Sequence, residues 1–127
     1  MKGWLQRRFG CTGLRIPLPG PWQVELWLAP RGAVIPPHTH PHIISRLVFL
    51  AGRMGWQRGA VSREFNWRDF GRSFLVPPDC VHGAVTLGAF GLFLNLEHWL
   101  PGAAKTSAAV DLEMENSDGE NLEGRKA

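Results

Sequence analysis

Glycine and proline interrupt this chain so often that little room is left for long helices. The 127 residues include 15 Gly and 10 Pro, and both residue types destabilise a helix interior and favour turns. Between the interruptions, residues 22–29 alternate as a strand does, with Leu26 and Leu28 on one face and Gln23 and Glu25 on the other. Eight or so short strands with closely spaced turns predict an all-β sandwich or barrel.

The chain divides into three segments by composition, with a length that fits one domain. Residues 1–12 show no clear strand pattern, and we expect an irregular N-terminal arm there. Residues 13–110 hold the alternating segments and form the expected barrel. Residues 111–127 are acidic, polar and free of aromatic side chains, which is typical of a disordered tail.

Charge and cysteine content narrow the class of protein. Two of the 14 basic and six of the 11 acidic residues follow residue 110, so the first 110 residues carry 12 basic and five acidic ones, net +7. This charge favours a small anionic ligand, against the alternative of a solvated basic surface. No basic run or binding motif indicates nucleic acid. No apolar run reaches the roughly 20 residues of a membrane span, no signal peptide is evident, and the two cysteines predict a reduced, cytoplasmic protein.

Three of the five histidines lie at alternate positions, in His38-Thr39-His40-Pro41-His42. In an extended strand such side chains project from one face, and imidazole is a common ligand of transition metals. His38 and His40 can chelate one ion, whereas His42 joins them only if the chain does not bend at Pro41. A second apolar segment leads through two prolines to His82, which we expect to return to the same cavity.

The spacing around these histidines forms two longer patterns. The first reads Gly32, five residues, His38-Thr39-His40, four residues, Ser45, six residues, Gly52. The second reads Gly71, five residues, Pro77-Pro78-Asp79, two residues, His82, three residues, Thr86. Together they resemble the two motifs of the cupin superfamily, with Ser45 in the place of a Glu, Asp79 in the place of a Gly and Thr86 in the place of an Asn.

The resemblance implies a single small jelly-roll β-barrel, with His38, His40 and His82 binding one divalent transition metal inside it. Imidazole ligands favour Fe, Ni, Cu, Zn or Co over Mg or Ca. Because the hydroxyl of Ser45 is a poor ligand, the usual carboxylate is missing. Three-histidine cupins such as the thiol dioxygenases use such a site for O₂ chemistry. The alternative is a cupin that has lost its metal and keeps polar residues in its cavity.

Other residues are candidates for roles beside the metal. Glu97 is the carboxylate that we nominate as a general base, because it shares a strand face with Asn95; the alternative is a solvated edge. His42 and Ser45 are candidates for groups around the metal ligands, against a solvent-exposed histidine and a hydroxyl that only fills the cavity wall.

The function we predict is that of a metal-binding small cupin, acting as a metal-dependent enzyme on a small molecule. An oxygenase-like reaction is favoured, beside isomerase-like or lyase-like chemistry, and Trp56 and Trp67 are candidates for its pocket wall. Whether the chain catalyses any reaction stays open at this point. The alternative is a non-catalytic ligand- or metal-binding module, and a third is a structural component of a dimer. We expect a homodimer, because the apolar strands outnumber what one barrel interior can bury.

Overall fold

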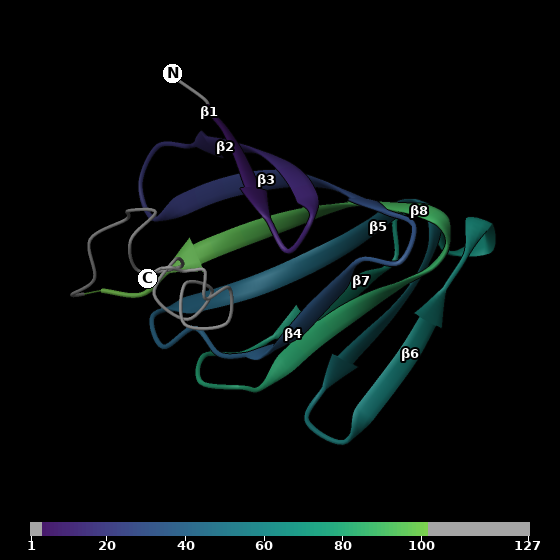
Figure 1. The fold of residues 1–127 in the computed structure, drawn as a ribbon. Helices are drawn as coiled ribbons and strands as arrows, with labels where there is room; N and C mark the ends of the chain where they lie inside the picture. The colour runs from purple at the N-terminus through teal and green to yellow at the C-terminus, as the bar shows by residue number, and fades with distance from the viewer. Residues whose placement is uncertain (1–3, 102–127) are drawn as a thin grey trace, which may run out of the picture.

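The computed structural model describes residues 4–101, and these residues form eight strands and one short 3₁₀ turn (Figure 1). The elements are β1 (Trp4–Arg8), β2 (Cys11–Pro17), β3 (Trp22–Pro30), β4 (Val34–His38), β5 (Ile43–Arg58), β6 (Val61–Phe65), η1 (Trp67–Asp69), β7 (Ser73–Val76) and β8 (His82–Trp99). The prediction of an all-β jelly-roll barrel is confirmed. The described residues include no helix with the length and apolar character of a membrane span.

Two long strands organise the barrel. The strand order is β1-β2-β3-β8-β5-β6, with β4 also on β8 and β7 also on β5, and every pair is antiparallel. One half of β8 pairs with β3 and with the first half of β5, whereas the other half pairs with β4 and with the second half of β5. Each long strand therefore crosses from one side of the barrel to the other, as Figure 1 shows.

A glycine allows this crossing inside a long strand. The sequence predicted short strands, but β5 has 16 residues and β8 has 18, and β5 continues through Gly52. The backbone of Gly52 has a φ of +88°, and a Cβ there would lie 2.1 Å from the carbonyl oxygen of Phe90. Only glycine fits, so it permits a bend inside the sheet.

The N-terminus also differs from the expectation. Where an irregular arm was predicted over residues 1–12, the structure has β1 and the start of β2, joined by a turn in which Phe9 and Gly10 have positive φ. This hairpin extends the sheet beyond β3. The predicted tail, residues 111–127, lies outside the described residues.

Aromatic side chains fill one part of the interior. Trp56 packs against Phe65, Phe74 and Phe93 with ring centroids 4.6 to 5.9 Å apart, and it is only 1% exposed. Burial of this apolar area is the main stabilising contribution expected for the barrel. The interior also buries polar and charged side chains, among them Arg15, Gln23, Glu25, Asn95 and Glu97.

Candidate metal centre

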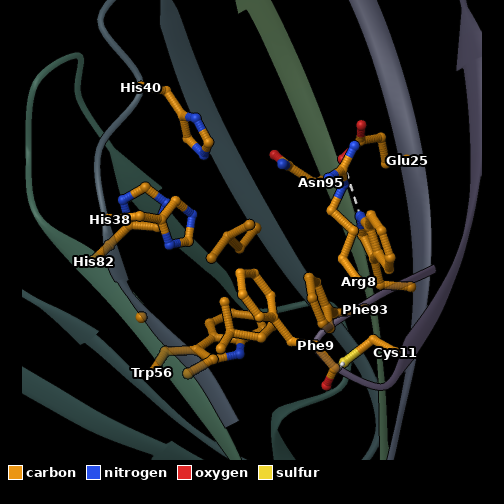
Figure 2. A pocket seen from close by; sticks show the side chains of 15 residues that line it. Arg8, Phe9, Cys11, Glu25, His38, His40, Trp56, His82, Phe93 and Asn95 are labelled. Atoms are coloured by element: carbon orange, nitrogen blue, oxygen red, sulfur yellow. Dashed lines mark hydrogen bonds between the residues drawn. The ribbon is translucent and has the colours of Figure 1, made fainter. Parts of the chain in front are cut away.

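Three histidines meet at one end of the barrel interior. His38 is the last residue of β4, His40 follows two residues later, and His82 is the first residue of β8, where it is the register partner of His38. One ring nitrogen from each residue lies within 4.8 Å of those from the other two. Figure 2 shows the three rings on one side of the pocket. The structure thus brings together the three residues that the sequence predicted as ligands.

Backbone carbonyls orient two of the rings. The Nδ1 atom of His38 lies 2.8 Å from the carbonyl oxygen of Pro36, and that of His82 lies 3.0 Å from the carbonyl oxygen of Cys80. Because a carbonyl oxygen only accepts, each Nδ1 must carry the proton and donate. The lone pair of each neutral ring is therefore on Nε2, the arrangement in which a histidine is oriented for metal binding.

Burial keeps these rings neutral. Loss of solvent lowers the pKa of His40 to about 2, with a smaller contribution from the neighbouring His38 and His82. Burial, together with His38, lowers the pKa of His82 to about 4. The pKa of His38 is also lowered by burial, although its bond to the Pro36 carbonyl opposes the shift. At neutral pH all three side chains are in the form that binds a metal.

The other two candidates near the metal have different surroundings. The strand ends at His38, and Pro41 and His42 form a turn, so His42 is exposed and cannot join the other histidines on a strand face. The alternative of a solvent-exposed histidine is correct for His42. Ser45 is 3% exposed and faces the interior of the barrel, but it does not line the cavity beside the histidines.

The cavity that adjoins the histidines has a volume of about 60 Å³. Trp56 forms part of its wall, as predicted, whereas Trp67 is 76% exposed and was wrongly proposed for that role. Burial raises the pKa of Cys11 to about 11, so this residue lines the cavity as a neutral thiol. The full lining is Arg8, Phe9, Cys11, Glu25, Trp27, Ile35, His38, His40, Leu47, Trp56, His82, Gly83, Ala84, Phe93 and Asn95.

Glu25, which lines the cavity, belongs to a buried ion pair with Arg15. The guanidinium of Arg15 contacts Oε2 of Glu25 through Nε at 2.8 Å and Nη2 at 2.7 Å, and both residues are at most 2% exposed. Nε1 of Trp27 donates to Oε1 of Glu25 at 2.9 Å. Sequence analysis named neither Arg8 nor Arg15 as an interior residue, and it treated residues 1–12, which include Arg8, as irregular. The alternation of Cys11, Gly13 and Arg15 on one face of β2 was the available signal.

Comparison with solved structures identifies the architecture. The structure of KdgF from a Halomonas species matches with a TM-score of 0.67 at 21% identity, covering 77% of this chain and 87% of that one. An RmlC-like cupin from Shewanella frigidimarina matches with a TM-score of 0.66 at 19% identity, covering 80% and 87%. A Cupin 2 conserved barrel domain protein from Salinispora arenicola matches with a TM-score of 0.61 at 20% identity, covering 84% of this chain and 85% of that one. The domain has the cupin fold. No family model matches the sequence, and neither does any curated protein.

The histidines of the two motifs lie at or near the ends of strands in this fold. The His-x-His pair of the first motif lies at and just after the end of β4, and the histidine of the second motif begins β8. Ser45, which stands where the motif has Glu, is the cross-strand partner of Glu97. An interior carboxylate is therefore present next to this position, but it comes from β8.

Glu97 is fully buried, so the alternative of a solvated edge is wrong. Its Oε1 accepts from Nε2 of Gln23 at 2.8 Å, and its Oε2 accepts from Nδ2 of Asn95 at 3.1 Å. Asn95 lines the cavity of the cupin barrel, whereas Glu97 lies behind it and is not part of the lining. Glu97 can therefore influence a ligand through Asn95.

Proposed function

We propose that this cupin domain binds one divalent transition metal through His38, His40 and His82 and acts on a small molecule held in the adjoining cavity. The observation that carries the proposal is the convergence of three buried imidazoles, with ring nitrogens within 4.8 Å. Three neutral nitrogen donors suit Fe, Ni, Cu, Zn or Co. Such a metal supplies Lewis-acid polarisation or, when redox-active, O₂ chemistry.

The residues of the chain supply binding and orientation. His38 and His82 are held in one tautomer by the carbonyls of Pro36 and Cys80. Trp27, Trp56 and Phe93 give the cavity an apolar wall. The carboxylate in the described lining, Glu25, is engaged by Arg15 and Trp27. This arrangement favours chemistry that needs no proton transfer from a protein carboxylate.

The same shortage of a free acid or base supports a second candidate, a ligand- or metal-binding module without catalysis. The two functions differ in turnover. An enzyme of the oxygenase class consumes O₂ when loaded with Fe²⁺ and supplied with substrate, whereas a binding module does not. Loss of O₂ consumption in the His38→Ala/His82→Ala variant would assign the reaction to this site.

Elemental analysis of protein purified without a metal-affinity tag tests the metal. We expect about one transition metal per chain in the wild type and none in the His38→Ala/His82→Ala variant. The His42→Ala variant is the matched control, because His42 is exposed and outside the cluster. Stoichiometric metal that persists in the double variant would contradict the proposal.

A further inference from the structure

Asn95 presents a hydrogen-bond acceptor to the cavity. It lies on the inner face of β8, is 9% exposed and contributes to the cavity lining. Figure 2 shows its amide directed from β8 toward the side of the pocket that holds His40. Within the part of the chain that the structure describes, the Oδ1 atom of Asn95 has no hydrogen-bond partner. A buried polar atom of this kind calls for a partner from outside the protein.

Glu97 determines which amide atom faces the cavity. Oε2 of Glu97 accepts a hydrogen bond from Nδ2 of Asn95 at 3.1 Å, so the NH₂ group of Asn95 faces Glu97. Gln23 donates to the other carboxylate oxygen at 2.8 Å and helps to hold Glu97 in place. The amide of Asn95 therefore cannot turn over without losing this bond, and its oxygen stays directed away from Glu97.

The partner that fits this oxygen is a hydrogen-bond donor on the ligand. An ether or a hydrocarbon leaves Oδ1 of Asn95 desolvated and unpaired, whereas a hydroxyl group satisfies it. A volume of about 60 Å³ holds roughly four to six water-sized spheres. The ligand that enters this space is correspondingly small, with about six non-hydrogen atoms.

The charges around the cavity indicate the second group on the ligand. Among the residues that the structure describes, the charged side chains of the cavity lining are one cation and one anion, Arg8 and Glu25. Three neutral imidazoles leave the charge of a bound divalent metal uncompensated. An anionic group, such as a carboxylate, compensates it.

We propose that the cavity binds a small hydroxycarboxylate, with its hydroxyl group donating to Oδ1 of Asn95 and its carboxylate at the metal end. The carboxylate part rests on the proposed metal site, whereas the hydroxyl part rests on Asn95 and Glu97. Glu97 is in this account a positioning residue, because it acts on the ligand through Asn95.

Three ligands that differ at one carbon test the hydroxyl. Lactate carries the donor, propionate lacks the oxygen, and 2-methoxypropionate keeps the oxygen without the donor. Calorimetric titration of Zn²⁺-loaded wild type should show that lactate binds about tenfold or more tighter than either analogue. The reason is that only lactate makes the buried hydrogen bond, whereas the analogues leave Oδ1 of Asn95 unpaired. Equal affinities, or no lactate binding at millimolar concentrations, would overturn the proposal.

Two variants assign the preference to Asn95. Asn95→Leu removes the acceptor and keeps the branched shape of the side chain, so the ratio of lactate to propionate affinity should fall to about one. Thr86→Val is the matched control, because it removes a buried oxygen from the same strand at a position that does not line the cavity. It should keep the preference for lactate. A preference that survives in Asn95→Leu would contradict the role of Asn95, and if that variant fails to fold, the wild-type comparison of lactate with 2-methoxypropionate decides.

Failure of the metal site and failure of this proposal give different results. If elemental analysis and Zn²⁺ titration find no metal, the proposed function is wrong. The contact between the ligand hydroxyl and Asn95 is still supported in that case if chelator-treated wild type prefers lactate to propionate. If metal binds at the three histidines but lactate and propionate bind alike, the metal site stands and the ligand class is overturned.

Discussion

Strand β3 presents opposite chemistry to the two sides of the sheet. Its inner face buries Gln23 and Glu25 to 2% exposure or less, whereas its outer face leaves Leu26 and Leu28 at 36% and 46% exposure. The contrast continues across neighbouring strands. One outward row of register partners is Leu5, Leu14, Leu26, Leu94 and Val48, on β1, β2, β3, β8 and β5.

The two faces of the sheet differ in the kind of contact that they can make. The inner face holds charged and amide groups around a cavity, which is costly for each buried polar atom that finds no partner. The outer face carries apolar area that residues 4–101 leave exposed, which is typical of a surface that contacts another molecule. Each prediction below perturbs one face and uses a matched position elsewhere as its control.

We expect the largest loss of stability from a substitution on the inner face. Arg15→Met leaves the Glu25 carboxylate buried without its cationic partner, and we expect the free energy of unfolding in urea to fall by about 3–5 kcal/mol. Replacing both residues, as Arg15→Met with Glu25→Leu, should cost less than the single change. Arg53→Met, which breaks the exposed pair with Glu64, is the control and should leave the midpoint unchanged. Similar losses for the buried and the exposed pair would contradict the account.

The outer face should join two copies of the chain. Five strands about 4.8 Å apart span about 20 Å, and several apolar rows on them approach the roughly 800 Å² that each partner contributes to a stable interface. Because the same sheet face on a second copy is apolar in the same way, we expect a homodimer related by a two-fold axis. Light scattering at tens of micromolar should give a dimer for the wild type and a monomer for Leu28→Glu.

Val61→Glu is the control for the dimer, since Val61 is 44% exposed but lies on β6, away from this row. It should remain dimeric. A monomeric wild type would contradict the prediction. If removal of residues 102–127 then makes that monomer bind an apolar dye, those residues rather than a second copy cover the face.

We expect a smaller effect on the pH dependence of stability, which arises from the buried histidines. In the unfolded chain these residues have a pKa near 6.5, whereas in the folded protein the pKa of His82 is about 4. Between these values the unfolded state binds more protons, so the metal-free protein should lose stability as pH falls from about 6.5 toward 4. Thermal melting with a chelator measures this loss. His82→Gln should weaken the dependence, and the exposed His42→Gln should not; identical slopes in all three proteins would contradict it.

Motif spacing predicted the histidine cluster across a long stretch of chain. His38 and His82 are separated by 44 positions, yet the structure makes them register partners on β4 and β8. The spacing between the two histidine motifs carries this information, because it sets the strand lengths that return the chain to the same end of the barrel. The fold class followed from the same spacing and from alternation.

Alternation could not predict which face of β3 or β8 is inside. It grouped Asn95 with Glu97 correctly, but hydrophobicity favoured the opposite face as the buried one. The polar face is inside because Gln23 and Asn95 bond Glu97, and Arg15 bonds Glu25. The contact between Gln23 and Glu97 joins strands β3 and β8, which are distant in sequence, so no local pattern reveals it. Strand β1 was missed for a related reason, since it is held by pairing with β2, which in turn pairs with β3.

The most direct test of the central claim is the X-ray absorption spectrum of the protein loaded with Co²⁺. The account predicts three imidazole nitrogen ligands, from His38, His40 and His82, with the remaining ligands being oxygen, and loss of the imidazole signal in the His38→Ala/His82→Ala variant. A spectrum without imidazole scattering, or one with sulfur from Cys80, would contradict the proposed metal centre.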